Sequence, residues 1–238
     1  MNKNNNWNYI WNNREIEMKS DYELSDLIKA NGFDTDFSRY DENSWRSMVK
    51  DVANIAGVKQ NDTVLEIGCG CGAFLFALNE LADLNIVGFD SSYQLTEMAK
   101  KVLSDGTFTR TEAINFEYKK NFFEKIFSHG VFIYFESIDY AFSIIESSYE
   151  ALKSHGSLCL MDINDVSFKK DYYSLRESLY KEDKEYEKKY ENLQHLFIDK
   201  NDLHNFLIQL GFRKIKYFPH KIKSYKMGQY RFNLVAIK

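Results

Sequence analysis

The alternation of hydrophobic and polar positions is clearest in the second quarter of the chain. A buried apolar run over 63–67 leads directly into a glycine-rich turn, and a short apolar helix is expected over 74–81. A second apolar run over 85–89 ends at Asp90, and beyond it apolar residues recur at helical spacing over 95–102. This order of strand, helix, strand and helix is typical of a parallel sheet.

The same alternation continues toward the C-terminal end. Further strands are expected at 108–111, 125–128, 156–162, 212–218 and 230–237. A helix over 138–152 is expected with Ser137 as its N-cap, and a last helix is expected between an Asp199 cap and a Gly211 stop. Residues 169–191 indicate a charged helix, and residues 1–60 a helical and aromatic segment. The pattern predicts an α/β protein.

The composition is that of an ordinary globular protein. Hydrophobic residues make up 44% of 238 residues, which is enough for one core and short for two full domains. The 31 basic and 35 acidic residues leave a net charge of −4, which does not indicate nucleic acid or an anionic membrane as partner. The sequence shows no apolar run of about 18 residues, no signal core and no disulfide framework. We therefore expect a cytoplasmic protein.

The stretch Gly68–Ala73 carries the strongest chemical signal. A strand, a glycine turn and a helix N-terminus form a backbone surface that a ligand can approach closely. The stretch also fits the dinucleotide fingerprint G-x-G-x-x-A, and Asp90 suits the ribose of a dinucleotide or of S-adenosylmethionine. Glu66 distinguishes the two, because a carboxylate there would repel a pyrophosphate and attract a cationic amine or sulfonium. Pairing of Glu66 with a donor in the core is the structural alternative.

The segment Val64–Gly72 resembles the first motif of class I S-adenosylmethionine-dependent methyltransferases, h-h-(D/E)-h-G-x-G-x-G. Val87–Ser92 is similar to their ribose-binding strand end, and 127–134 resembles their fourth-strand motif. Glu112 and Glu124 stand where the family usually has Asp. The resemblance implies S-adenosyl-L-methionine as cofactor and S-adenosyl-L-homocysteine as product. It assigns to the cofactor the residues Glu66, Gly68, Cys69, Gly70, Asp90, Ser91, Glu112, Ala113, His129 and Gly130.

The resemblance extends over about residues 60–238. It implies a Rossmann-like seven-stranded sheet, mostly parallel with the last strand antiparallel, and a helical lid. The implied units are an N-terminal lid or cofactor cover (1–60), a cofactor-binding core (61–164), a helical lid insertion (165–198) and a C-terminal helix with strands that complete the core (199–238). Residues 7–14 are similar to the openings of small methyltransferases that modify surface polysaccharides and other polar metabolites.

For the acceptor we expect a small polar metabolite, with phosphorylated or nucleotide-linked compounds and capsule or surface-glycan precursors among the candidates. Methylation of oxygen is favoured over nitrogen. A hydroxyl usually needs a base, and His195, between the lid helix and the last helix, is the predicted base, with a packing role as the alternative. The residues expected to hold the acceptor are Tyr9, Tyr134, Tyr172 and Arg176.

Three further features of the sequence concern metal binding, the basic tail and prolines. No metal is expected, because Asp162 and Asn164 lack a third well-spaced ligand. The basic tail over 213–226 is either the exposed face of an edge hairpin or a phosphate clamp. Pro219 is the only proline, so the D/N-P-P-Y/F motif of enzymes that methylate base amino groups is absent.

Two rival functions use the same glycine loop. An NAD-dependent oxidoreductase would bind its cofactor there, although Glu66 and the lack of a second nucleotide-binding half argue against it. A non-catalytic subunit would bind S-adenosylmethionine without transferring a methyl group by itself. The tyrosine-rich charged helix also leaves a homodimer open.

Overall fold

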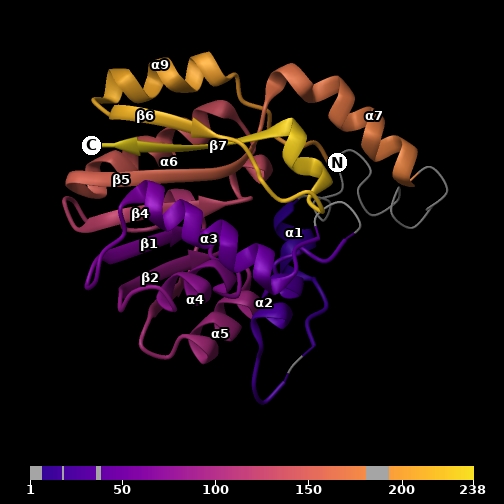
Figure 1. Cartoon of the computed structure of the whole chain (residues 1–238), viewed down its shortest axis with the longest axis horizontal. Coiled ribbons are helices and arrows are strands. Elements are labelled where there is room, and N and C mark those ends of the chain that lie inside the picture. Colours follow the sequence, from indigo (N-terminus) through magenta and orange to yellow (C-terminus); the bar gives the residue numbers. More distant parts are fainter. Residues whose placement is uncertain (1–6, 18, 36–38, 181–192) are drawn as a thin grey trace.

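A computed structural model gives the structure of the protein and describes residues 7–17, 19–35, 39–180 and 193–238. Within these residues one seven-stranded sheet has the order β3-β2-β1-β4-β5-β7-β6 (Figure 1). The strands are β1 (Thr63–Ile67), β2 (Asn85–Asp90), β3 (Thr107–Arg110), β4 (Phe123–His129), β5 (Leu152–Asn164), β6 (Arg213–Phe218) and β7 (Arg231–Ile237). Strand β7 runs antiparallel to β5 and β6, and the other described strand pairs are parallel, so the predicted fold class is confirmed.

Helices cover both faces of the sheet (Figure 1). They are α1 (Trp7–Asn12), α2 (Leu24–Ala30), α3 (Glu42–Ala56), α4 (Ala73–Asn79), α5 (Tyr93–Val102), α6 (Ile138–Ala151), α7 (Lys169–Tyr180) and α9 (Lys200–Leu210). Successive strand residues point to opposite faces, so Val64 packs with the core of α2, α3, α4 and α5, whereas Leu65 packs with that of α6 and α9. Burial on both faces explains why the central strands are apolar throughout.

The helix ends follow the local sequence signals. Ser137 accepts a hydrogen bond from the backbone N–H of Tyr140, and Asp199 caps α9. Gly211 ends α9 with a φ of 105°, which is a left-handed conformation that favours glycine. The predicted charged helix is confirmed as α7 up to Tyr180, and its remaining predicted residues, 181–191, lie outside the described part of the chain.

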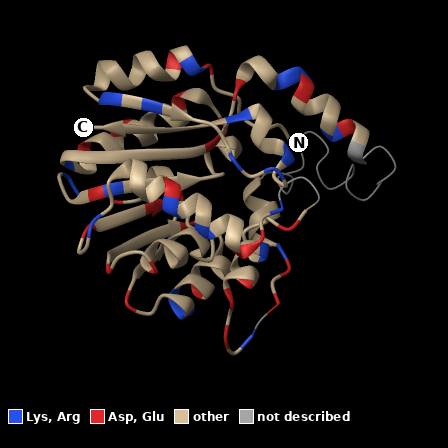
Figure 2. Ribbon diagram, viewed as in Figure 1, with Lys and Arg blue, Asp and Glu red and all other residues tan. Residues whose placement is uncertain are grey.

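The edge strand β6 explains part of the basic tail. Arg213, Lys214 and Lys216 are exposed on it, and Figure 2 shows these positive charges along the strand beside the largely uncharged interior of the sheet. Lysine on an edge strand discourages pairing with another chain. No helix in the described ranges combines the length and the apolar character needed to cross a membrane.

Candidate functional site

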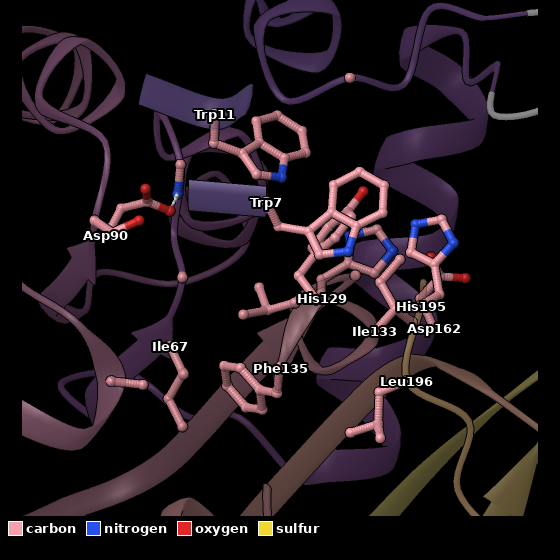
Figure 3. Close-up of a pocket in the computed structure, with 18 of the residues that line it drawn as sticks. Trp7, Trp11, Ile67, Asp90, His129, Ile133, Phe135, Asp162, His195 and Leu196 are labelled. Atoms are coloured by element: carbon pink, nitrogen blue, oxygen red, sulfur yellow. Dashed lines mark hydrogen bonds between the residues drawn. The ribbon is translucent and has the colours of Figure 1, made fainter. Parts of the chain in front are cut away.

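A cavity of about 770 Å³ opens at the carboxyl ends of the central strands. Its wall includes Ile67 from β1, Asp90 from β2, His129 from β4 and Asp162 from β5 (Figure 3). The chain runs from β1 through β2 to β3 on one side of β1 and then crosses to β4 on its other side, and such a switch point creates a crevice in an α/β sheet. The cavity therefore lies where this architecture binds ligands.

The glycine loop forms one wall of the cavity. Gly68 and Gly70 have φ values of 65° and 54°, in the left-handed region. A Cβ atom on Gly68 would lie 2.5 Å from the Val131 side chain, and one on Gly70 would lie 2.2 Å from Oδ1 of Asn31. The backbone N–H of Gly70 donates to Asp90 over 2.9 Å, which ties the loop to the end of β2. Only glycine fits both positions without displacing these neighbours.

Two buried carboxyl groups lie beside this loop. Glu66 is 2% exposed, and its Oε2 atom has no hydrogen-bond partner in the described residues. Burial, and then the nearby Asp90, raise the pKa of Glu66 well above its usual value. Burial also raises the pKa of Asp90, although the N–H groups of Ser92 and Gly70 oppose that shift. An unpartnered buried carboxyl oxygen next to an open backbone loop suits a cationic ligand such as the amino or sulfonium group of S-adenosylmethionine.

Helix α1 lies across the same end of the cavity. Asn8 accepts a hydrogen bond from the Ser91 hydroxyl over 2.9 Å and donates to Glu112 over 2.6 Å. The indole N–H of Trp7 donates to the carbonyl of Gln194 over 2.8 Å. These contacts join α1 to the ends of β2 and β3 and to the segment before α9, so α1 covers the predicted cofactor residues.

His195 lies at the other end of the cavity and is 8% exposed. Its Nδ1 atom is 2.8 Å from Nη1 of Arg176 and 2.8 Å from the Tyr172 hydroxyl. A guanidinium can only donate, so Nδ1 accepts and the ring hydrogen of the neutral imidazole is on Nε2. Burial, and then Arg176 and Arg231, lower the pKa of His195 well below its usual value, which keeps the ring neutral. The Trp7 ring stacks on it with centroids 4.5 Å apart.

A buried ion pair forms the floor next to His195. Asp162 accepts from Arg231 and from the Tyr225 hydroxyl, and Nε2 of His220 is 3.2 Å from its other oxygen. Burial alone would raise the pKa of Asp162, but Arg231 and His220 outweigh it and hold that pKa well below the usual range. Arg231 also donates to Asn164 over 2.9 Å. The two oxygen ligands considered for a metal are therefore bonded to a guanidinium.

Comparison with known proteins now identifies the family. The profile of the family described as "Methyltransferase domain" matches residues 58–211, well over half of the chain. The chain belongs to this family. The family and the fold imply S-adenosylmethionine as cofactor, which confirms that prediction, and they contradict the NAD-dependent alternative.

The relatives of this methyltransferase domain are distant. It is 32% identical over 111 residues to the sterol 24-C-methyltransferase of Pneumocystis carinii, a match that covers 44% of this chain and 29% of that protein. The chain thus spans about a third of the length of the curated relatives it matches.

Solved structures show the same fold at low identity. A protein of Methanococcus maripaludis assigned as an S-adenosyl-L-methionine-dependent methyltransferase has a TM-score of 0.57 at 18% identity, over 94% of this chain and 97% of that one. One from Listeria monocytogenes with the same assignment has a TM-score of 0.60 at 17% identity, over 83% and 99%.

The methyltransferase domain brings most predicted site residues to the cavity. The cofactor candidates that line it are Glu66, Gly68, Gly70, Asp90, Ser91, Glu112, Ala113, His129 and Gly130. Cys69 does not line it, because its side chain is buried and its N–H donates to Phe89. Tyr134 and His195 line the other end of the cavity, which we call the acceptor end. Tyr172 and Arg176 do not line it, but both are hydrogen-bonded to His195. Tyr9 lies on α1 away from the lining and is 45% exposed. The roles of these residues stay predictions.

Sequence reasoning missed several residues of the wall. They are Trp7, Asn8, Trp11, Asn31, Phe33, Gln194, Tyr225 and Arg231. The sequence carries a signal for Arg231, because it begins a strand that is apolar apart from Asn233. Asn31 and Phe33 carry no comparable signal, because they reach the cavity only through the packing of α2 beside the glycine loop.

Proposed function

We propose that this chain transfers the methyl group of S-adenosylmethionine to a small polar acceptor bound in the same cavity. The observation that carries the proposal is Glu66, a buried carboxyl group with an unpartnered oxygen next to the glycine loop. Bound S-adenosylmethionine would supply the electrophilic methyl group, so the protein has to supply position and exclusion of water.

The described residues divide these tasks. Glu66 would bind the cationic part of the cofactor, Asp90 the ribose hydroxyls, and Glu112 with Ala113 the adenine side. Helix α1, with Asn8 bonded to Glu112, would shield this end from water. This arrangement supports transfer in a closed cavity, where polar interactions are stronger than in water.

We propose an oxygen rather than a nitrogen as the acceptor atom. Hydrogen-bond donors face the acceptor end, namely Nε2–H of His195, the guanidinium of Arg231 and the hydroxyl of Tyr134. Donors suit the lone pairs of an oxygen, whereas an amine acceptor would need hydrogen-bond acceptors to orient its N–H groups. The buried charges also favour a polar acceptor over a sterol, although sterol methyltransferases are among the relatives.

Surface-glycan precursors, including phosphorylated or nucleotide-linked sugars, are the acceptors that we propose for a first screen. This choice depends on the resemblance, predicted from the sequence, of residues 7–14 to the openings of small methyltransferases that modify surface polysaccharides and other polar metabolites. It also depends on the polar acceptor end of the cavity. Incubation of the purified chain with S-adenosylmethionine carrying a deuterated methyl group, followed by mass spectrometry of small-molecule pools, should reveal a labelled product. Absence of product in these pools, together with tight binding of S-adenosylhomocysteine, would favour the non-catalytic subunit.

We propose that the chain works as a monomer or a homodimer without a separate catalytic subunit. Light scattering on the purified chain measures the assembly state. Recovery of methyl transfer only after addition of a co-purifying protein would contradict this part of the proposal.

A further inference from the structure

The acceptor end of the cavity contains two hydrogen-bond donors that are held in place but have no acceptor among the described residues. Arg231 uses Nε for Asn164 and Nη1 for Asp162 and Tyr225. Its side chain is 7% exposed, and its Nη2 atom makes no hydrogen bond within the described part of the chain. Because Nη2 is not sealed in the protein interior and Arg231 lines the cavity, this group faces the open space.

His195 presents the second donor. Arg176 donates to Nδ1, which leaves the hydrogen on Nε2, and no described residue accepts from Nε2. This nitrogen is also open to the cavity, and the ring is held from one face by Trp7. In the tautomer that Arg176 selects, the nitrogen open to the cavity donates a hydrogen bond and does not accept a proton.

The two donors flank one side chain. The Tyr172 hydroxyl is bonded to His195, and the guanidinium of Arg231 lies over the Tyr172 ring, 5.8 Å from its centroid. The ring of Tyr225 holds the guanidinium from a second direction, also at 5.8 Å. Both donors are therefore anchored, so a ligand that pairs with them needs little reorganisation of the protein.

The two ends of the cavity differ in the charge of the residues that line them. Glu66, Asp90 and Glu112 line the cofactor end and would repel an anion. At the acceptor end the buried carboxylate, Asp162, is already bonded to Arg231. Lys169 and Glu136, which carry opposite charges, also line the cavity, and both are exposed.

We propose that Arg231 and His195 together bind an anionic oxygen group of the methyl acceptor, a carboxylate or a phosphate. This inference rests on the proposed function, because it takes the cavity as the site of methyl transfer. It gives His195 the role of a positioning donor in place of the general base predicted from the sequence. It also defines the acceptor class as small acids and phosphorylated compounds.

The test uses the full chain saturated with S-adenosylhomocysteine. Inorganic phosphate, methyl phosphate and acetate are titrated by calorimetry, each against chloride at the same ionic strength to account for screening. We expect binding of phosphate or acetate beyond the chloride control, and the stronger of the two anions identifies the group. Binding no stronger than that of chloride for all three anions would overturn the inference.

Variants assign the site to the two donors. His195→Phe keeps a ring for Trp7 but loses the N–H, and we expect an anion affinity lower by about tenfold or more, as for loss of a hydrogen bond to a charged group. His195→Gln restores a donor and should recover part of the affinity. Arg231→Lys keeps a charge for Asp162 without Nη2 and should lose a similar factor, whereas Lys216→Gln on the exposed edge strand should lose nothing.

Two further measurements keep the outcomes distinct. Ring ¹⁵N shifts of His195 should report the Nε2–H tautomer, and an Nδ1–H tautomer would contradict the proposed donor. Binding of S-adenosylhomocysteine is measured separately in every variant. If the wild-type chain does not bind S-adenosylhomocysteine, the proposed function is refuted. If His195→Phe binds S-adenosylhomocysteine normally and its anion affinity is unchanged, only this inference is refuted.

Discussion

Glu66 and Asp162 show how the two ends of the cavity differ. Both carboxyl groups are almost completely buried, at 2% and 1% exposure, and both lie at strand ends of one sheet. Burial and Asp90 raise the pKa of Glu66, whereas Arg231 and His220 outweigh burial and lower the pKa of Asp162. The two side chains carry the same kind of chemical group, so the charges next to each one decide the direction of its pKa shift. Among the described residues, the acceptor end supplies Asp162 with a charged partner, Arg231, whereas the cofactor end supplies none to Glu66.

The two ends also differ in how the chain builds them. The cofactor end uses the glycine loop after β1 together with the residues that follow the next two strands, Asp90 at the end of β2 and Glu112 after β3. The acceptor end combines Tyr134 after β4, Asp162 of β5, His195 before α9 and Arg231 of β7, which are far apart in the sequence. A local motif therefore determines the first end, and long-range packing determines the second.

The largest expected effect is on the stability of the acceptor end. Asp162→Asn leaves the buried Arg231 without its charged partner, which should lower the free energy of unfolding by about 3–5 kcal/mol. Chemical denaturation measures this change. Asp105→Asn, at an exposed position in the turn after α5, is the control, with an expected change of less than about 0.5 kcal/mol. A loss for Asp162→Asn no larger than for the control would show that the ion pair does not stabilise this end.

The matching change at the cofactor end should affect binding and not stability. Glu66→Gln removes a carboxylate that has an unpartnered oxygen, so the unfolding midpoint should not fall. The affinity for S-adenosylmethionine should fall by about 10- to 100-fold, as for loss of a charged hydrogen bond. Calorimetric titration measures it, with Glu97→Gln on the exposed face of α5 as the control. Unchanged affinity would mean that Glu66 does not contact the cofactor.

Binding of S-adenosylmethionine should depend on pH through Glu66. The carboxyl group has a raised pKa in the free protein and must be ionised to pair with a cation, so binding releases a proton. Affinity should therefore fall as the pH is lowered through the raised pKa, by at most about tenfold per pH unit. Titration in buffers of different ionisation enthalpy counts the released protons. Glu66→Gln should remove this release, and an unaltered release in that variant would assign it to another group.

The smallest effect is expected when helix α1 is loosened from the cofactor end of the cavity. Asn8→Ala removes the bonds from α1 to Ser91 and Glu112, both partly exposed to solvent, at a cost of about 1 kcal/mol. Dissociation of S-adenosylhomocysteine should become about fivefold faster in stopped-flow fluorescence. Asn54→Ala on the exposed side of α3 should leave the rate unchanged. Equal rates in both variants would show that α1 does not restrain the bound cofactor.

The sequence predicted much of the fold because its signals are local. The seven strands, the Ser137 and Asp199 caps and the Gly211 stop all depend on neighbouring residues, and the structure has them. Glu66 and Asp90 were found for the same reason, since a charged residue in or after an apolar strand is visible in the sequence itself.

Arg231 and Asp162 could not be paired from the sequence, because 69 positions separate them. Asp162 also has a φ of 67° at an irregularity in the pairing of β5 with β7, and such a bulge redirects a side chain. His195 was selected from the sequence, but its tautomer depends on Arg176 and Tyr172 across a tertiary contact.

The sequence by itself thus determined the sheet, the family's glycine loop and the carboxyl groups that suit the cofactor. The tertiary structure decided which buried carboxyl group is paired, which nitrogen of His195 carries the hydrogen and which donors face the acceptor. The physical reason is the distance along the sequence over which each interaction acts. Backbone geometry and hydrophobic periodicity act over a few residues, whereas desolvation and charge pairing depend on groups that only folding brings together.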